Sequence, residues 1–190
     1  MMRKVYIITF MLVIGLFLVS CETEVENHAG TRDYYPNADQ SEWIYKDVIS
    51  ENEYTYRLNG TAQHSQAGEV QVLEITYSGN TSKMYVLVTD EMAVLYYDLT
   101  SDARYELLHF PINVGDTWNW VCGTVEYSAV VQGREEVNTE AGDFADCFKV
   151  QYSCAGSPVD TMWYADGVGM VREAFGNDYD LKLKSYNFPP

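Results

Sequence analysis

Short runs of β-prone residues follow one another along most of the chain. From Trp43 onward, segments rich in Val, Tyr, Thr and Ile recur about every eight to twelve residues, and Gly, Asn, Asp and Ser separate them. No convincing helical periodicity lies between these segments. Because this spacing is typical of antiparallel meanders, sandwiches and barrels, the sequence predicts an all-β domain without a major helix.

The expected strands are bounded by residues that favour turns. They are Trp43–Ile49, Tyr54–Leu58, Glu69–Tyr77, Lys83–Thr89, Ala93–Leu99, Arg104–Phe110, Thr117–Val131, Glu135–Thr139, Asp146–Ser153, Thr161–Ala165, Gly169–Phe175 and Tyr179–Asn187. The segment Thr117–Val131 is long for one strand, and Gly123 in its middle predicts a bend or bulge where the chain changes direction and curls the sheet. A turn is expected at Gln132–Gly133.

The apolar pattern predicts how the sheet is covered. In the last strand Leu181 and Leu183 alternate with charged residues, which indicates one buried and one exposed face. The runs Tyr85–Val88 and Ala93–Tyr97 show no alternation, so both of their faces should be covered. A single curved antiparallel sheet, or an open barrel, around aromatic side chains meets both requirements.

Length and charge fit one folded domain and exclude one class of partner. The chain has 190 residues, of which 47% are hydrophobic, and this is enough to fill a core. The chain has 12 Lys and Arg against 28 Asp and Glu, which gives a formal net charge of −16. We expect no nucleic-acid partner, because phosphate binding requires clustered Lys and Arg.

The first residues resemble a bacterial lipoprotein signal peptide. Basic residues precede an apolar run, Val5–Leu18, that is short for a membrane-spanning helix. The run ends in Leu18-Val19-Ser20-Cys21, which is similar to a lipobox. That resemblance implies that a diacylglycerol is attached to Cys21 and that signal peptidase II cuts between Ser20 and Cys21. The alternatives are an ordinary signal peptide before a chance cysteine, or a single transmembrane anchor.

Three segments of different function are therefore expected. Residues 1–20 would be the signal peptide, residues 21–33 a lipidated flexible tether, and residues 34–190 the β-domain. Acyl chains on Cys21 would hold the protein at the outer membrane. The acidic residues directly after Cys21 resemble a surface-export signal of bacterial lipoproteins, so the periplasmic and the external face both stay open.

Several segments together resemble a protein family. They are Tyr34–Pro36, Ser41–Tyr45, Phe110–Trp118, Ala141–Val150 and Met162–Val171. They are similar to the pattern FP..VGDTW … AG.F.DC..V … WYA.GVG.V of a family of uncharacterised bacterial secreted proteins and lipoproteins. The resemblance implies one β-rich domain, similar in outline to the open, strongly curved barrels of lipoprotein-localisation factors. It implies no activity and no catalytic residues.

One of these segments has a clear local interpretation. Asp166-Gly167-Val168-Gly169 places two glycines around one apolar residue. This arrangement predicts a hairpin turn whose Val168 side chain lies under the sheet.

Three cysteines remain beyond Cys21, in a compartment where disulfides persist. Cys147 and Cys154 are seven positions apart along one expected strand and its exit, too far for a bridge if the chain stays extended. We therefore expect one disulfide between Cys122 and one of the other two, and three reduced, buried thiols are the alternative. The apolar neighbours of Cys147 argue against a catalytic thiol.

Sequence motifs of catalytic, metal or cofactor sites are lacking. His28, His64 and His109 are isolated, and the chain has no Cys-x-x-Cys pair, Gly-x-Ser-x-Gly elbow or Gly-rich nucleotide loop. We therefore expect no metal, no cofactor and no catalytic residue. Paired carboxylates of a glycoside hydrolase stay open in a chain with 28 acids.

The aromatic content is the remaining indication of function. The chain has 16 Tyr and 4 Trp, which is more than a core alone tends to use. Trp118, Trp120, Trp163 and Tyr164 are candidates for a concave face that binds sugar rings or an acyl chain. The alternative is that they pack across neighbouring strands.

The first functional hypothesis is therefore a non-enzymatic, membrane-anchored module. It would bind an apolar or carbohydrate ligand, or an envelope protein. A structural envelope lipoprotein without a small-molecule ligand is the second hypothesis. A carboxylate-dependent hydrolase acting on glycans is the third.

Overall fold

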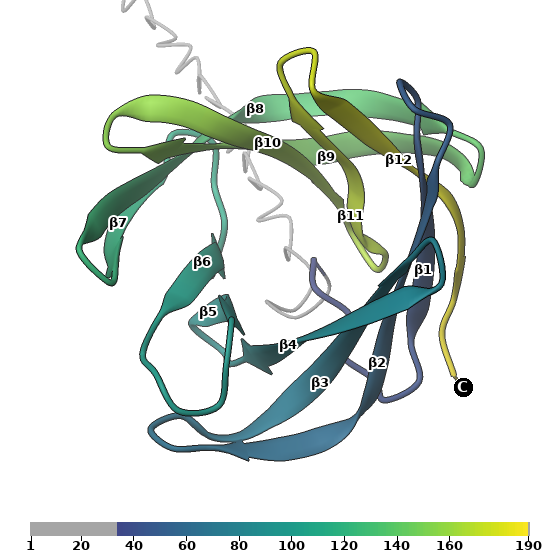
Figure 1. The fold of residues 1–190 in the computed structure, drawn as a ribbon. Helices are drawn as coiled ribbons and strands as arrows, with labels where there is room; N and C mark the ends of the chain where they lie inside the picture. Colours follow the sequence, from purple (N-terminus) through teal and green to yellow (C-terminus); the bar gives the residue numbers. More distant parts are fainter. Residues whose placement is uncertain (1–33, 190) are drawn as a thin grey trace, which may run out of the picture.

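A computed structural model describes residues 34–189 as an all-β barrel (Figure 1). No helix occurs in this part of the chain, and so none that could cross a membrane. The twelve strands are β1 (Glu42–Asp47), β2 (Glu53–His64), β3 (Gly68–Tyr77), β4 (Asn80–Val88), β5 (Met92–Tyr96), β6 (Arg104–His109), β7 (Thr117–Cys122), β8 (Val125–Thr139), β9 (Gly142–Cys154), β10 (Ser157–Ala165), β11 (Gly169–Phe175) and β12 (Tyr179–Asn187). The expected signal peptide, Ser20, Cys21 and the tether lie outside the described residues.

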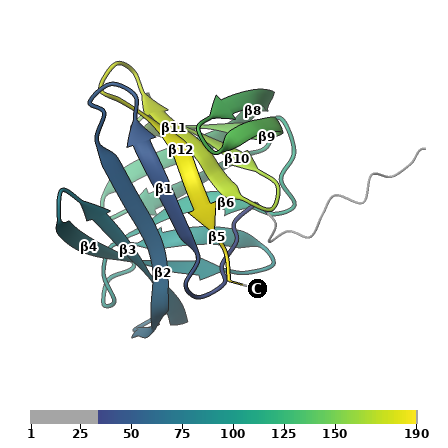
Figure 2. The ribbon, with the colours of Figure 1, turned by 90° about the vertical axis from the view of Figure 1, so that its right-hand side faces the viewer.

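All twelve strands belong to one antiparallel sheet. Their order is β6-β5-β4-β3-β2-β1-β12-β11-β10-β9-β8-β7, so the first strand pairs with the last in the middle of the sheet. Figure 2 shows β2, β1, β12 and β11 side by side in this region. The sheet curls until β6 and β7 face each other, but these two strands share no backbone ladder. The expected open barrel is therefore confirmed, with one seam between β6 and β7.

Indole side chains bridge this seam. Trp118 and Trp120 on β7 are both buried, and their indole nitrogens donate to backbone carbonyls of β6. The bond from Trp118 reaches Glu106 and the bond from Trp120 reaches Arg104, each at 3.1 Å. Side chains thus supply the bonds that a backbone ladder supplies between the other neighbouring strands.

The chain changes direction within Thr117–Val131, as expected, but the segment forms two strands and not one bent strand. The chain reverses at Gly123, which adopts φ +64°, and β7 pairs with β8 in a tight hairpin. The expected turn at Gln132–Gly133 is wrong, because β8 continues through it as a register shift between Val131 and Gly133. A glycine in an apolar run is compatible with either a bulge or a turn, and pairing with neighbouring strands decides between them.

The other patterns agree with the structure. Leu181 and Leu183 are buried between exposed or half-buried neighbours. Leu95 of β5 faces the barrel interior, while Val94 and Tyr96 pack in a separate cluster with Val70 from β3. Both faces of β5 are therefore covered, as its lack of alternation predicted. The turn before β11 also forms as expected, with Val168 buried.

Candidate ligand-binding cavity

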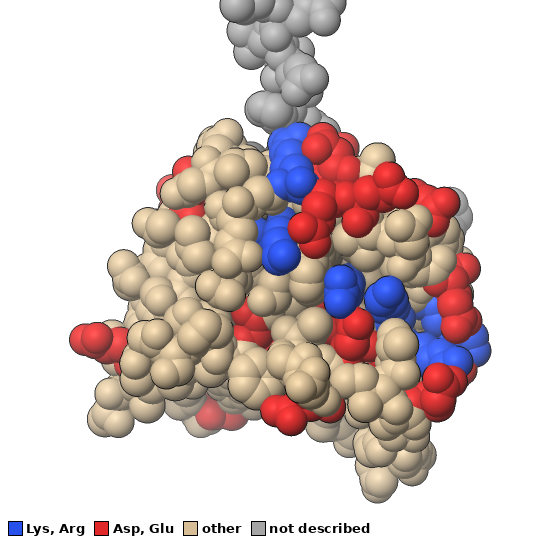
Figure 3. Space-filling view, turned by 90° about the horizontal axis from the view of Figure 1, so that it is seen from above, with Lys and Arg blue, Asp and Glu red and all other residues tan. Residues whose placement is uncertain are grey.

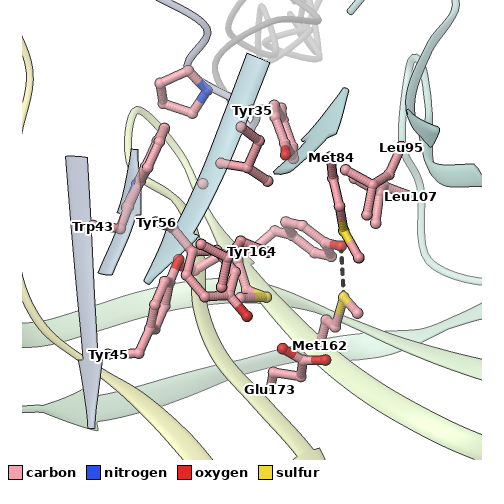
Figure 4. Close-up of a pocket in the computed structure, with 15 residues that line it drawn as sticks. Tyr35, Trp43, Tyr45, Tyr56, Met84, Leu95, Leu107, Met162, Tyr164 and Glu173 are labelled. Atoms are coloured by element: carbon pink, nitrogen blue, oxygen red, sulfur yellow. Dashed lines mark hydrogen bonds between the residues drawn. The ribbon is translucent and has the colours of Figure 1, made fainter. Parts of the chain in front are cut away.

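The barrel encloses a cavity of about 190 Å³. An engineered protein cavity of about 150 Å³ is enough to hold benzene, so this space can accept a ring or a short chain. Figure 4 shows the side chains that point into it. They are Tyr35, Pro36, Trp43, Tyr45, Tyr56, Leu73, Ile75, Met84, Leu95, Leu107, Met162, Tyr164, Gly169, Met170 and Glu173.

Strand alternation explains this lining. Trp43 and Tyr45 are two positions apart on β1, Leu73 and Ile75 are two apart on β3, and Tyr56 lies on β2 between them. Residues at a spacing of two share one face of a strand, and in a closed sheet that face is the interior. The cavity is thus built mainly from the half of the barrel around β1.

The segment before β1 covers part of the cavity. Tyr35 and Pro36 line it, and Tyr34 packs edge-on against Phe148 with the ring centroids 5.1 Å apart. Gly169 permits this close approach. An added β-carbon at Gly169 would lie 3.1 Å from Cδ of Pro36, and the backbone there has φ +89°. Trp43 also contacts the turn next to Gly169, because its indole nitrogen donates to the carbonyl of Val168 at 2.8 Å.

Two of the tyrosine hydroxyls in the cavity are bonded by the protein itself. Tyr45 donates to the carbonyl of Met170 at 2.9 Å. The Tyr164 hydroxyl lies 3.0 Å from that of Tyr152 and donates to the sulfur of Met162 at 3.1 Å, which is the dashed line in Figure 4. These bonds hold the two rings in fixed positions on the cavity wall.

Two other hydroxyls in the cavity have no such partner. Tyr35 and Tyr56 both line the cavity, and no hydrogen bond to either hydroxyl forms within residues 34–189. Burial raises the pKa of both phenols, and the charge of Glu173 adds to the effect at Tyr56. Buried polar groups normally find a partner, so hydroxyls left open toward a cavity are groups that a ligand can satisfy.

An acidic side chain lies at one end of this otherwise mostly apolar cavity. Glu173 on β11 accepts a hydrogen bond from the hydroxyl of Tyr179 at 3.2 Å, and the same hydroxyl donates to Asp160 on β10. Burial, and then the charge of Asp160, raise the pKa of Glu173 to about 7. Burial also raises the pKa of Asp160, which the bond from Tyr179 partly offsets.

No basic side chain of the described residues forms an ion pair with Asp160 or Glu173. Arg172, next to Glu173, points to the opposite face of β11 and pairs there with Asp180 at 2.8 Å. Figure 3 shows Lys and Arg side chains in a band on one face of the molecule, with Asp and Glu side chains beside them. The carboxyl group of Glu173 in the cavity, and that of Asp160 next to it, thus have no Lys or Arg partner among the described residues.

The structure separates the four residues of the expected ligand face. Trp118 and Trp120 are buried at the β6–β7 seam and do not line the cavity. Trp163 shares a face with Lys149 and Arg172, its partners on β9 and β11, whose charged groups lie 5.2 and 4.4 Å from its ring. Tyr164 is the residue of this set that lines the cavity.

Sequence reasoning missed most of the residues that form the cavity. Trp43 and Tyr45 are two positions apart on one strand, and Tyr56 lies between Thr55 and Arg57 on the next, so their shared face was readable from the sequence. What the sequence did not show is that this face is the concave one. Nothing in the sequence marked Glu173 as a cavity residue either, because a single acid among Val171, Arg172 and Ala174 is ordinary on an exposed strand.

The expected disulfide with Cys122 is not present. Cys122, Cys147 and Cys154 are all free in the described part of the chain. β8 lies between Cys122 on β7 and Cys154 on β9, and two strand spacings of about 4.8 Å exceed the reach of a disulfide. Cys147 pairs with Glu135, far along β8 from Val125, the partner of Cys122. Burial raises the pKa of the Cys147 thiol to about 11.

The two histidines of the described residues have structural partners. His64 is buried at the end of β2, where its ring accepts from the backbone of Gln66 and Ala67. His109 bonds to Glu106 at 2.9 Å and stacks on Trp118. Across residues 34–189, no group of three or more His, Cys, Asp or Glu side chains is placed to hold a metal ion.

Comparison with known proteins gives one partial match. Residues 128–187, which run from β8 to the end of β12, match the family model described as DUF3108-like. This segment is thus similar to an uncharacterised domain family. No curated protein and no solved structure is significantly similar to the chain.

Proposed function

We propose that the protein is an outer-membrane lipoprotein whose barrel binds an apolar ligand in its interior. The observation that carries this proposal is the cavity of about 190 Å³ lined by aromatic, Met and Leu side chains. A β-barrel core that served folding alone would be filled at the density of other protein interiors. The role is one of binding, with no catalytic step.

The sequence supports the location. The apolar run up to Leu18 and the lipobox-like Leu18-Val19-Ser20-Cys21 favour export and acylation at Cys21. The resemblance to bacterial secreted proteins and lipoproteins, and in outline to lipoprotein-localisation factors, favours the same location. The cell envelope, on either face of the outer membrane, is where such a module would meet acyl chains and other apolar compounds.

The hydrolase hypothesis has one observation in its favour. Asp160 and Glu173 bond to the same hydroxyl of Tyr179, so two carboxyl groups lie close together. Asp160, however, does not line the cavity, and the wall beside Glu173 is formed by Met162, Tyr45 and Tyr56. A glycosidase needs both carboxyl groups to reach the sugar, so the geometry favours binding over hydrolysis.

The proposal is tested by filling the cavity from one strand. Met84 on β4 points into it, whereas Lys83 points to the outer face, where it pairs with Glu74 at 3.1 Å. We expect octanol to bind the full chain, held in lipid nanodiscs, in a saturable manner by calorimetry. Met84→Trp should remove this binding because the indole occupies the space.

Lys83→Trp is the matched control, since it adds the same indole one residue away on the other face. It should bind octanol as the unchanged protein does. Octanol also partitions into the lipid of the nanodiscs, and this contribution is the same for all three proteins. The difference between their binding heats therefore measures binding in the cavity. Equal heats for all three would show that the barrel holds no ligand.

A further inference from the structure

The cavity has two chemically different ends. Leu73, Met84, Leu95 and Leu107 form an apolar end. Tyr45, Tyr56, Tyr164 and Glu173 bring phenol rings and a carboxyl group together at the other, as Figure 4 shows. A ligand that fills the whole space must therefore have an apolar body and a polar head.

The polar end has fewer hydrogen-bond donors than acceptors. The hydroxyl of Tyr179 has one proton, yet both Asp160 and Glu173 lie within hydrogen-bonding distance of it. One oxygen of Glu173 has no partner in the described chain, and neither has the hydroxyl of Tyr56 beside it. When both acids are ionised, the site has more acceptors than the protein can satisfy.

The polar end also lacks positive charge. The causes that act on the protonation of Asp160 and Glu173 are burial, the Tyr179 bond and, for Glu173, the charge of Asp160. No Lys or Arg of residues 34–189 is among them, because Arg172 is held on the outer face by Asp180. Two buried carboxyl groups without a cation favour a ligand that brings one.

The aromatic rings favour the same head group. Ring faces attract cations, and Tyr45, Tyr56 and Tyr164 surround the space next to Glu173. A carboxylate head would be repelled by Glu173, and a hydroxyl head would not supply the missing charge.

From this geometry we propose that the cavity binds a primary alkylammonium ligand, with its ammonium on Glu173 and Tyr56 and its chain toward Met84 and Leu107. This inference rests on the proposed function and adds the ligand class to it. The ammonium donates to the free oxygen of Glu173 and to the hydroxyl oxygen of Tyr56. Tyr179 is a positioning residue, since it holds the carboxyl group of Glu173 and does not reach the ligand.

The test compares three ligands with the same chain and different heads. Octylammonium, octanol and octanoate are titrated by calorimetry at pH 8 into the full chain in nanodiscs, with empty nanodiscs as the blank. We expect octylammonium to bind about tenfold or more tightly than octanol, because hydrogen bonds to charged groups are the stronger ones. Octanoate should bind most weakly.

Glu173→Gln separates charge from shape, because the amide keeps the size of the side chain. It should remove the preference for octylammonium, because it weakens the binding of octylammonium far more than the binding of octanol. Glu69→Gln, at an exposed position on β3, is the control and should keep the preference. Tyr56→Phe should weaken octylammonium several-fold while octanol changes less.

The two proposals fail in different ways. The ammonium site would be overturned if octanol bound as tightly as octylammonium, or if Glu173→Gln still preferred octylammonium. Either result would still agree with an apolar ligand-binding cavity. Tighter binding of octanoate would have the same two consequences. If none of the three ligands binds, the proposed function fails as well.

Discussion

The indole nitrogen of Trp118 lies 3.1 Å from the carbonyl oxygen of Glu106 and donates a hydrogen bond across the β6–β7 seam. The indole nitrogen of Trp120, two residues further along β7, donates in the same way to the carbonyl oxygen of Arg104, also at 3.1 Å. At this seam the sheet lacks a backbone ladder, so these side chains hold its two ends together. Tyr152 adds a third bond, from its hydroxyl to the carbonyl of Leu107. Two of the four residues that suggested a ligand surface, Trp118 and Trp120, thus close the barrel.

Trp118→Phe should loosen the seam selectively. The substitution keeps a ring but leaves a buried carbonyl on β6 without its donor, at a cost of about 1–3 kcal/mol. We expect faster hydrogen exchange at the amides of β6 and β7 and little change at β1. Trp163→Phe is the control, because it also loses an indole bond, to Glu135, but on the outer face. Equal effects of both variants on β6 exchange would contradict a closing role for Trp118.

Glu173 should make stability depend on pH in a defined range. Its pKa is raised from 4.5 to about 7, so between these values the folded state holds a proton that the unfolded state has lost. The free energy of unfolding should therefore be higher below pH 4.5 and decline as the pH rises to 7, by up to about 3 kcal/mol. Acids whose pKa is lowered, such as Asp47, act in the opposite sense and at lower pH.

The matched measurement is urea unfolding of the protein and of Glu173→Gln at pH 5, 6, 7 and 8. The variant keeps a neutral side chain throughout, so its stability relative to the unchanged protein should increase with pH. Parallel curves for the two proteins would show that Glu173 does not carry the pH dependence.

Gly169→Ala should displace the segment that covers the cavity. The added methyl group would meet Pro36 at 3.1 Å and would occupy a backbone with φ +89°. Gly167→Ala has a similar strain, at φ +69°, but nothing within 4 Å of the added carbon. We expect Gly169→Ala to lower the free energy of unfolding by about 1–2 kcal/mol more than Gly167→Ala. The thermal midpoints of the two variants measure this difference, and equal midpoints would contradict the contact with Pro36.

The three cysteines of the barrel should all be free in the purified protein. Without a reductant, alkylation after denaturation should label Cys122, Cys147 and Cys154, as peptide mass spectrometry can show. In the folded protein Cys147 should react far more slowly than the other two, because it is fully buried and its pKa is raised to about 11. A peptide pair linked through Cys122 would contradict the structure.

Cys21→Ala should release the protein from the membrane fraction. Without the thiol, no diacylglycerol can be attached, and one apolar segment of this length does not anchor a protein stably. Labelling with a radioactive fatty acid and globomycin-sensitive processing measure the modification directly. Cys122→Ala is the control and should stay acylated. Unchanged labelling of Cys21→Ala would reject the lipobox interpretation.

Much of the fold was predictable from local patterns. The spacing of β-prone runs predicted an antiparallel all-β domain, because each pattern depends on neighbours within a few residues. The alternation at Leu181 and Leu183, and the turn that buries Val168, were predictable for the same reason. The patterns did not show that Gly123 reverses the chain while Gly133 lies within a continuous strand.

The site depended on tertiary structure. Alternation shows which residues share a face, but not which face becomes concave, since the sense of curvature arises from the pairing of distant strands such as β1 and β12. That pairing turned Trp43, Tyr45 and Tyr56 inward and Trp163 outward. The sequence by itself determined strands and turns, and it predicts a signal for export that lies outside the described residues. Only closure of the sheet brought Glu173 into an apolar interior and Trp118 to the seam, because burial belongs to the assembled barrel and not to any local segment.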